Sequence, residues 1–260
     1  MGRGVTSFES LFRLDGKSVL VAGGYGAIGE HIADLLVAAG ASVALAGRSQ
    51  EKADAAAARH DERASGVALD VVDEESVERG VATAAERLGG LDVVVNCASI
   101  LVEEPADTLD PDDWRRVLDT NLTGAFWLSR VAARRMREAG TGGRIIHFSS
   151  TRSAVGGRRG FSAYSASKGG LNALVKQLAT EWAGDGITVN AVAPGFVATE
   201  FVEGLTSDQS FQQMLLRRIP LGRFGEADEV AATAVFLATP AAGFITGQII
   251  FVDGGVTASS

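Results

Sequence analysis

The sequence predicts one α/β domain built around a parallel sheet that helices cover on both faces. Short runs rich in valine and isoleucine alternate along the chain with alanine- and leucine-rich segments of helical spacing. Runs that are apolar throughout are typical of parallel strands, because both of their faces are buried. The 260 residues are 46% hydrophobic and contain no repeat, linker or break in composition, which favours a single core. We therefore expect about seven strands in a doubly wound sheet, joined by right-handed helical crossovers, in one domain over residues 1–260.

Apolar runs place the predicted strands at residues 18–22, 42–46, 67–69, 92–96, 144–148, 188–192 and 249–252. Helical spacing predicts helices over 29–39, 50–59, 74–88, 122–138, 163–182 and 227–237. Residues 199–220 interrupt the alternation between a strand and the last helix, and we interpret them as a lid over a substrate site. The apolar final strand is expected at an edge of the sheet, where it would pair with a second copy of the chain.

Composition and charge argue against several classes of protein. The formal net charge is −8 and no extended basic run is present, whereas nucleic-acid binding demands a basic footprint. No apolar stretch approaches the ~20 residues of a membrane span. The first residues are polar and charged, which argues against a signal peptide, and the single cysteine excludes an internal disulfide. We expect a cytoplasmic protein with no nucleic-acid or membrane partner.

A glycine-rich turn follows the first predicted strand and leads directly into the first main helix. Within it, Gly24, Gly26 and Gly29 fit the pattern G-x-G-x-x-G. Glycine lets the main chain approach a pyrophosphate, and the N-terminus of the following helix offers unpaired N–H groups. The position between strand and helix favours a dinucleotide site over a turn that is tightly packed for its own sake. The residues expected at the cofactor here are Gly23, Tyr25, Gly26, Ala27, Ile28 and Gly29.

The end of the second predicted strand indicates which dinucleotide binds. An acidic residue there would bind the ribose hydroxyls of NAD, but the chain has Arg48, whose planar guanidinium suits a 2′-phosphate. NADP(H) is therefore expected, with NAD(H) possible. After the third strand, Asp70 either accepts a hydrogen bond from the adenine amino group or caps the next helix, a role for which Asp73 competes.

Tyr164 and Lys168 are four residues apart in a predicted helix and therefore share one of its faces. A positive charge beside a phenol favours the phenolate and lowers the pKa of the phenol from its usual value of about 10. A tyrosine tuned in this way exchanges a proton with an alcohol or a carbonyl oxygen. Alone, the pair is equally compatible with a half-buried tyrosine beside a solvated lysine.

Taken in order from about residue 14 to residue 255, these motifs closely resemble the short-chain dehydrogenase/reductase family. The residues that carry the resemblance are the glycine turn, Asn96-Cys97-Ala98-Ser99, Asn121, Ser149-Ser150, Tyr164-x-x-x-Lys168 and Pro194-Gly195. The resemblance implies a Rossmann-like domain, oxidation of secondary alcohols and reduction of ketones with a nicotinamide cofactor, and a homotetramer.

The resemblance also implies roles for individual residues. Tyr164 is the expected general acid/base, and Lys168 tunes it and binds the nicotinamide ribose. Ser150 holds the substrate oxygen, with Thr151 as the alternative because its spacing from the tyrosine matches the family better. Asn121 holds a water that links Lys168 to solvent. The other expected cofactor contacts are Val71, Asn96, Ala98, Pro194, Gly195, Val197 and Thr199.

The chain departs from the family pattern at four positions. The family usually has threonine at Ala22, glycine at Ala27, and Asn-Asn-Ala-Gly where this chain has Cys97 and Ser99. We expect these changes to affect the support around the cofactor more than the chemistry.

Substrate identity is the least constrained prediction. The segments 11–17, 179–183 and 220–226 resemble the gluconate 5-dehydrogenase branch of the family, which implies a sugar acid, polyol or keto acid as substrate. Arg152, Arg158 and Arg159 lie between Ser150 and Tyr164, where one of them would bind a substrate carboxylate. Solvated arginines, or arginines that contact a neighbouring subunit, are an equal alternative.

Two other functions fit the same motifs. A 3-oxoacyl-[acyl-carrier-protein] reductase would need a basic patch for its acidic carrier, which Arg134, Arg135 and Arg137 would supply. A dinucleotide-sensing protein without catalysis is disfavoured because all four expected catalytic residues are present. No residue spacing predicts a metal site, and His147 in a strand is expected to be a satisfied core residue.

Overall fold

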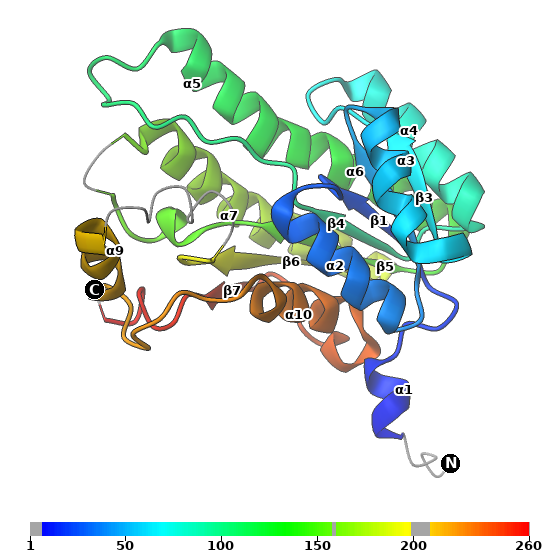
Figure 1. Cartoon of the computed structure of the whole chain (residues 1–260). Helices are drawn as coiled ribbons and strands as arrows, with labels where there is room; N and C mark the ends of the chain where they lie inside the picture. The colour runs from blue at the N-terminus through cyan, green and yellow to red at the C-terminus, as the bar shows by residue number, and fades with distance from the viewer. Residues whose placement is uncertain (1–6, 158–159, 199–208, 260) are drawn as a thin grey trace.

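The computed structural model describes residues 7–157, 160–198 and 209–259. The described chain forms one parallel sheet in the order β3-β2-β1-β4-β5-β6-β7 (Figure 1). Its strands are β1 (Ser18–Ala22), β2 (Ser42–Gly47), β3 (Ala64–Ala68), β4 (Val93–Asn96), β5 (Gly143–Phe148), β6 (Ile187–Pro194) and β7 (Ile249–Val252). The order reverses between β1 and β4, so the predicted doubly wound Rossmann-like sheet is confirmed.

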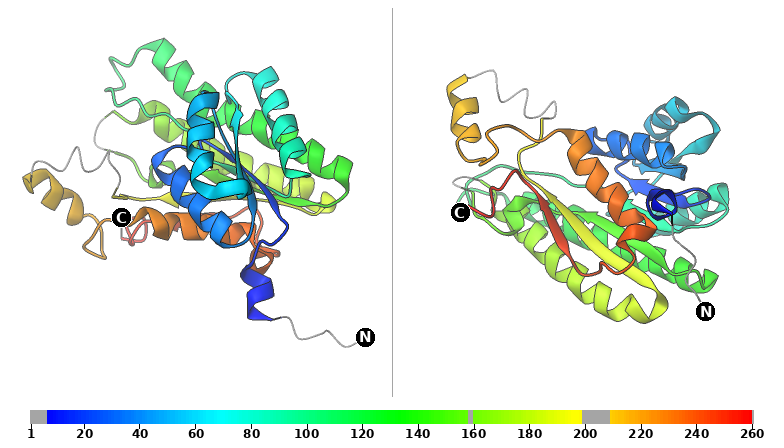
Figure 2. Two further views of the ribbon diagram at one scale, coloured as in Figure 1. Left: turned by 45° about the vertical axis from the view of Figure 1, so that its right-hand side comes forward. Right: turned by 90° about the horizontal axis from the view of Figure 1, so that it is seen from below.

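Helices cover both faces of this sheet. The main α-helices are α2 (Ala27–Ala38), α3 (Gln50–Ala57), α4 (Glu74–Leu88), α5 (Pro111–Leu118), α6 (Gly124–Ala139), α7 (Ser162–Trp182) and α10 (Ala227–Ala238). Two shorter ones are α1 (Phe8–Phe12), which projects from the body of the molecule, and α9 (Gln209–Leu216), which lies at its periphery (Figures 1 and 2).

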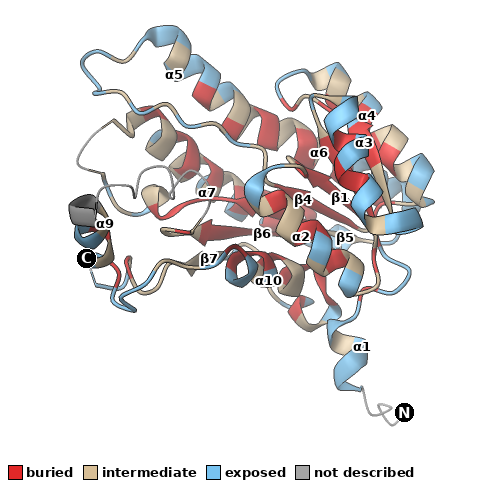
Figure 3. Cartoon of the chain, viewed as in Figure 1, coloured by how far each residue is buried: buried red, intermediate tan, exposed pale blue. Residues whose placement is uncertain are grey.

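Two hydrophobic clusters, one on each side of the sheet, form the core. On one side α2, α3 and α10 pack through residues such as Ile32, Leu36 and Val230. On the other side α4, α6 and α7 pack through residues such as Val81 and Leu128. Strand β1 is buried along its whole length, which agrees with its uniformly apolar sequence (Figure 3). The edge strand β7 is only partly buried.

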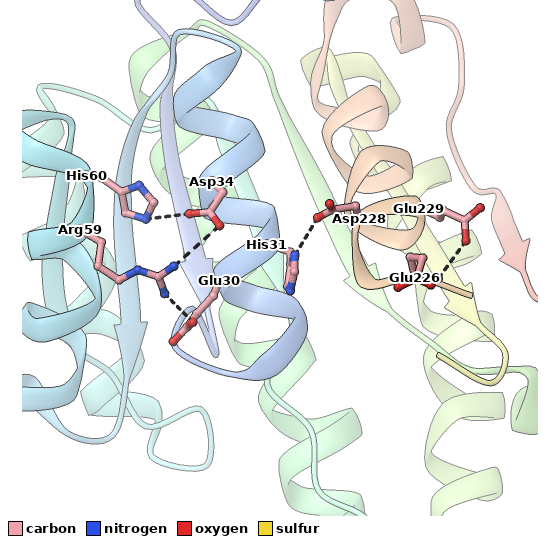
Figure 4. Close-up of polar contacts among 8 residues, drawn as sticks. All are labelled: Glu30, His31, Asp34, Arg59, His60, Glu226, Asp228 and Glu229. Atoms are coloured by element: carbon pink, nitrogen blue, oxygen red, sulfur yellow. Dashed lines mark hydrogen bonds and ion pairs between the residues drawn. The ribbon is translucent and has the colours of Figure 1, made fainter. Parts of the chain in front are cut away.

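Polar contacts hold α2, the helix that follows the glycine turn, to its neighbours (Figure 4). The His31 Nδ1 atom lies 2.7 Å from a carboxylate oxygen of Asp228 at the start of α10. On the opposite flank, Arg59 donates to Glu30 over 2.6 Å, and His60 lies 3.4 Å from Asp34. Apart from the His60 ring, these side chains are largely exposed, and exposed pairs of this kind are individually weak. Together they connect α2 to elements on both of its sides.

Most predicted elements occur at or within a few residues of their predicted bounds. One predicted helix, 122–138, is longer and composite: α5 continues through a π-helical turn, Asp119–Thr123, into α6. Strand β3 begins three residues before the predicted start, at Ala64. Asp73 caps α4 by accepting hydrogen bonds from the N–H groups of Glu75 and Ser76, so Asp70 is not the cap.

Of the predicted lid, residues 199–208 lie outside the described part of the chain, and the rest contains α9. Within the described residues, no helix is both long and apolar enough to cross a membrane.

Candidate active site

The candidate site lies at the carboxyl ends of β1, β4, β5 and β6. Strands β1 and β4 are neighbours in the sheet, but the chain winds away from them in opposite directions. A reversal of this kind leaves a crevice at the carboxyl ends of the strands, and open parallel sheets bind their ligands there.

The glycine turn after β1 leaves no room for side chains. Gly23 has φ +74° and donates its N–H to the carbonyl oxygen of Ala46 over 2.8 Å. A Cβ on Gly29 would lie 2.3 Å from the carbonyl oxygen of Gly23, so the first turn of α2 packs directly on the loop. Gly26 is the N-cap of α2 and supplies no side-chain cap. The backbone N–H groups at the N-terminus of α2, which include those of Ala27 and Ile28, are thus suited to bind a phosphate.

The neighbouring strand ends support this turn. A Cβ on Gly23 would lie 2.9 Å from the backbone nitrogen of Ala98, so the segment after β4 packs against the glycine turn. The Tyr25 ring lies across Gly47 at the end of β2, and the Tyr25 hydroxyl accepts the Ser49 N–H over 3.1 Å. The two strand ends therefore border the predicted dinucleotide site.

The residues expected to determine which dinucleotide binds lie just after β2 and β3. Arg48 is exposed and forms no ion pair with any described residue. One carboxylate oxygen of Asp70 accepts the Val72 N–H over 3.2 Å. Val71 is buried, and its carbonyl would lie 2.8 Å from a Cβ on Gly124, so it packs against the start of α6. Arg48 and Asp70 thus remain available for a ligand.

Asn96 is the last residue of β4, at the carboxyl end of the sheet. Its side chain is buried, and its oxygen accepts the N–H of Ala98 over 3.1 Å. Its amide nitrogen lies 3.4 Å from Nδ1 of His147. The side chain of Asn96 therefore shapes the turn that carries Ala98.

Tyr164 lies near the start of α7, beside the end of β5. Burial raises the pKa of its phenol, while hydrogen bonds with Ser150 and Ser99 and the charge of Arg152 act in the opposite direction. The structure thus brings Ser150 to the phenol. Thr151 is buried in the short turn that follows, Thr151–Ser153, and is not among the groups that act on Tyr164.

Lys168 is almost completely buried, and its Nζ atom donates to the carbonyl oxygen of Phe148 over 2.6 Å. The Nζ atom also lies 5.5 Å from the centre of the Tyr164 ring. Burial lowers the pKa of Lys168 from 10.5 to about 8. The two side chains thus lie together, as their spacing on one helix face predicts.

Asn121 occupies the π-helical turn between α5 and α6, a local widening that is frequent at functional sites. Its amide nitrogen donates to the carbonyl oxygen of Ile100 over 2.9 Å and to the hydroxyl of Ser167 over 3.1 Å. Its oxygen accepts the N–H of Ile100 over 2.8 Å and the hydroxyl of Ser99 over 3.1 Å. Protein groups use both donors and both lone pairs, so the expected water contact does not involve this side chain.

The segment after β6 closes the site on one side. Gly195 packs on Asp253, since a Cβ there would lie 2.8 Å from the Asp253 Cα. Val197 is buried and pairs with Gly225 as a parallel bridge, which holds the backbone after Pro194 in place. Thr199, the last of the expected contacts in this segment, lies outside the described residues.

Arg152 is half-buried beside the site. Its guanidinium stacks 4.6 Å from the centre of the Phe161 ring and donates to the carbonyl oxygen of Gly156 over 3.2 Å. Phe161 and Gly156 also line a cavity of about 560 Å³, next to the loop that carries Arg152. The predicted Arg158 and its neighbour Arg159 lie outside the described residues.

Two residues near the site were not predicted from the sequence. Ser99 was noted only as a departure from the family pattern, and its contact with Asn121 depends on the unpredicted π-helical turn. Arg218 follows α9, stacks 5.7 Å from the Phe196 ring, and lowers the pKa of Arg152 through its charge, after the larger effect of burial. Arg218 lies in the segment interpreted as a lid, where the pattern gave no structural signal.

His147 is a satisfied core residue. Ser129 donates its hydrogen to the carbonyl oxygen of Ala125, so it accepts from Nε2 of His147 over 2.9 Å. Burial lowers the pKa of His147 to about 3. Among the described residues, no group of three or more histidine, cysteine or acidic side chains is arranged to hold a metal ion.

Comparison with known proteins agrees with this geometry. A family model described as enoyl-(acyl carrier protein) reductase matches residues 23–257. Gluconate 5-dehydrogenase of Gluconobacter oxydans (strain 621H) is 36% identical over 256 residues, which cover 97% of this chain and 99% of that protein. The 3-oxoacyl-[acyl-carrier-protein] reductase FabG of Vibrio harveyi is 37% identical over 243 residues, covering 94% and 98% of the two chains.

A solved structure has the same fold. The crystal structure of a gluconate 5-dehydrogenase from Burkholderia cenocepacia J2315, in complex with NADP and tartrate, superposes with a TM-score of 0.92. The two proteins are 36% identical, and the match covers 97% of this chain and 99% of that one.

Fold, site and comparisons define an oxidoreductase built on a dinucleotide-binding sheet. The chain belongs to the short-chain dehydrogenase/reductase family, and it interconverts alcohols and ketones with a nicotinamide cofactor.

Proposed function

We propose that the protein transfers hydride between NADP(H) and a secondary alcohol or ketone that carries a carboxylate, such as a sugar acid and its keto form. The observation that carries the proposal is the meeting of Tyr164, Ser150 and Lys168 at the end of β5. They lie at the same end of the sheet as the glycine turn. A proton donor and a dinucleotide site are thus placed together.

The residues at the glycine turn suit the cofactor. Gly29 packs directly on Gly23, while Gly26 and Ala27 are exposed, and the N-terminus of α2 has no side-chain cap, so its N–H groups suit a pyrophosphate. Bound NADP(H) supplies or accepts the hydride. We assign the 2′-phosphate to Arg48, the adenine amino group to Asp70, and the carboxamide to the segment from Pro194 to Thr199. NAD(H) is the less favoured cofactor, because no acid ends the second strand.

The chemistry of the chain is proton transfer at the substrate oxygen. Tyr164 gives its proton to the carbonyl oxygen during reduction and takes it back during oxidation. Ser150 uses its hydroxyl hydrogen for the same oxygen, because its own oxygen already accepts the N–H of Arg152 over 3.1 Å. Lys168, still protonated below pH 8, binds the nicotinamide ribose and adds positive charge near the reacting groups.

The position of Arg152 supports a substrate that carries a carboxylate. Its guanidinium lies close enough to Glu103 and Tyr164 for their charges to act on it, but no described carboxylate lies within ion-pair distance of it. Arg218 adds a second positive charge on the same side. The structural relative from Burkholderia holds tartrate, a dicarboxylate. Arginine binds such groups through two parallel hydrogen bonds.

The second candidate, reduction of an acyl group on an acidic carrier, is supported by the similarity to FabG. The basic patch that it requires is largely neutralised, however. Arg134 pairs with Glu78, and Arg137 pairs with Asp185 over 2.6 Å. The keto-acid proposal is therefore preferred over the carrier protein.

We also propose that the chain works as a homotetramer, in which the exposed edge of the sheet at β7 pairs with a second copy. Strand β7 is the outermost strand and is only partly buried, which supports this proposal (Figure 2).

A substrate screen tests the proposed function. Keto acids, neutral keto sugars and acyl thioesters are mixed with the protein and either NADPH or NADH, and the loss of cofactor absorbance is followed. We expect the fastest turnover with NADPH and 5-keto-D-gluconate or a related keto acid. The Tyr164→Phe variant should lose activity by about 10²- to 10⁴-fold while keeping NADPH affinity. Tight NADPH binding without turnover of any compound would instead identify a sensor.

Replacement of Arg152 by alanine tests whether this residue binds a carboxylate on the substrate. Loss of a charge-assisted hydrogen bond costs roughly 1.5–3 kcal/mol, so the KM for a keto acid should rise at least about tenfold. The KM for a neutral ketone should not change. Arg115→Ala is the control, because Arg115 is exposed on α5 and pairs with Asp112 on the same helix. An equal rise in KM for neutral and acidic substrates would show that Arg152 supports the loop and does not bind the carboxylate.

A further inference from the structure

Tyr25 places a large side chain inside the glycine turn, between Gly24 and Gly26. The side chain is half-buried, and its ring reaches the end of the neighbouring strand β2. A Cβ on Gly47 would lie 2.4 Å from Cε1 of the ring and 2.6 Å from the hydroxyl oxygen. The absence of a side chain at Gly47 therefore makes room for the whole phenol, including its hydroxyl.

The phenol of Tyr25 contacts the chain on both sides of Arg48. Its ring packs on Gly47, the residue before, and its hydroxyl oxygen accepts the N–H of Ser49, the residue after, over 3.1 Å. Ser49 is fixed in turn, because its side chain caps α3 by accepting the Lys52 N–H over 3.2 Å. Arg48 itself is exposed and forms no ion pair with any described residue. Tyr25 thus holds the backbone from which an available guanidinium extends.

The hydroxyl of Tyr25 also keeps a hydrogen for a ligand. A phenol has one hydrogen to donate and can accept as well. Within the described part of the chain, this hydroxyl accepts from Ser49 and donates to no residue. The fold therefore uses its lone pair and leaves its hydrogen available next to Arg48. An anion bound at this place would accept a hydrogen bond from both side chains.

We propose that Tyr25 is a specificity-determining residue that donates its hydroxyl hydrogen to the 2′-phosphate of NADP(H). The inference rests on the proposed use of NADP(H) and on the assignment of that phosphate to Arg48. A hydrogen bond to a charged phosphate oxygen is about twice as strong as one between neutral groups. NAD(H) has only a neutral hydroxyl at the same position, so the phenol favours NADP(H).

The affinities of the full-length protein for NADPH and NADH test the proposal, because the two cofactors differ only in the 2′-phosphate. Tyr25→Phe removes the hydroxyl and keeps the ring on Gly47. We expect it to bind NADPH about tenfold more weakly in titration calorimetry, and NADH less than about threefold more weakly. Tyr164→Phe is the control, since it removes the hydroxyl of the only other tyrosine in the chain. It should leave the ratio of the two affinities unchanged.

Two comparisons separate donation to the phosphate from support of the loop. Tyr25→Phe also deprives the Ser49 N–H of its acceptor, which would affect both cofactors. An equal loss of NADPH and NADH affinity would therefore show support alone and would overturn the proposal. Tyr25→Phe is then added to Arg48→Ala, where it should still weaken NADPH several-fold more than NADH. No further loss in that background would also overturn the proposal, because the hydroxyl would act only through Arg48.

A second readout needs no nicotinamide and no turnover. Adenosine 2′,5′-bisphosphate and AMP differ only in the same phosphate, and the wild type should bind the bisphosphate more tightly. Tyr25→Phe should lose most of that difference. If the wild type binds both alike and NADPH no better than NADH, the NADP(H) assignment in the proposed function is wrong, and this inference is wrong with it. If the wild type prefers the phosphate and Tyr25→Phe keeps the full preference, only the role of Tyr25 is wrong.

Discussion

At the scale of single residues, burial acts in opposite directions on the two ionisable partners of the site. It raises the pKa of Tyr164 and lowers the pKa of Lys168 to about 8, because each charged form loses its water. The same burial raises the pKa of the Cys97 thiol to about 12, which keeps this neighbour of Lys168 uncharged. At Tyr164, the hydroxyl groups of Ser150 and Ser99 and the charge of Arg152 oppose the rise in pKa that burial causes.

His147 connects burial to the stability of the fold. Its folded pKa of about 3 lies below the ordinary value of 6.5, because burial penalises the imidazolium. Ser129 and Asn96 contact the two ring nitrogens of the neutral form. A group with a depressed folded pKa stabilises the protein fully above its unfolded pKa, and this stability is lost as the pH falls toward the folded value.

Replacement of His147 by glutamine should therefore make the free energy of unfolding fall less steeply as the pH is lowered. In the wild type, this group should lower the free energy of unfolding by about 1.4 kcal/mol for each pH unit between pH 6.5 and pH 3. Urea titrations at several pH values measure the slope, and data at pH 8 isolate the cost of altered packing. Ser129→Ala is the matched control, because it removes a hydrogen bond but keeps the titratable ring. Equal slopes in wild type and His147→Gln would contradict the prediction.

At the scale of elements, the sequence predicted segments whose apolar pattern is strong and missed those whose pattern is weak. Helix α4 occurs at its predicted bounds and β7 at its own. Helix α5 was not predicted, because five of its eight residues are charged or proline and only Val117 is buried. Its start does carry a signal, since Asp110 caps it and Pro111 takes the first position.

The glycine turn is the element that the sequence predicted in most detail, because glycine spacing reflects steric limits directly. Gly24 and Gly29 both lie where a Cβ would meet other atoms at less than 3 Å. At Gly26 the nearest atom would be 3.3 Å away, so that position tolerates a small side chain better. The support of the turn by Tyr25 and Ala98 was less predictable, because it depends on residues distant in sequence.

Gly29→Ala should damage the dinucleotide site more than the fold. The added Cβ would lie 2.3 Å from the Gly23 carbonyl, so the loop must move away from α2. Overpacking of this kind costs roughly 1–3 kcal/mol, and we expect NADPH affinity to fall at least about tenfold in titration calorimetry. Gly184→Ala is the control, because Gly184 is exposed and no atom would lie within 4 Å of its Cβ. Unchanged NADPH affinity in Gly29→Ala would show that the cofactor does not use this turn.

At the scale of the whole molecule, the alternation of strands and helices was enough to predict the sheet and the end at which ligands bind. It predicted Tyr164, Ser150 and Lys168 as neighbours because their order matches a known pattern. Ser99 and Arg218 were missed as functional candidates for a physical reason. Both reach the site through contacts across the fold, with Asn121 in one case and Arg152 in the other, and no local pattern records such contacts.

The edge of the sheet gives the last prediction, which concerns assembly. Strand β7 is an edge strand whose four residues are all only partly buried, and the nearby Phe244 is fully exposed. An apolar edge of this kind invites pairing with another chain, and a second copy would cover it. We expect the wild type to sediment as an oligomer at micromolar concentration and Phe244→Asp to dissociate at least about tenfold more readily. Because Phe244 is fully exposed, the substitution should not unfold the protomer. Val72→Asp, which changes an exposed apolar residue just beyond the opposite edge strand, is the control. A monomeric wild type, or equal dissociation of both variants, would show that β7 is not the interface.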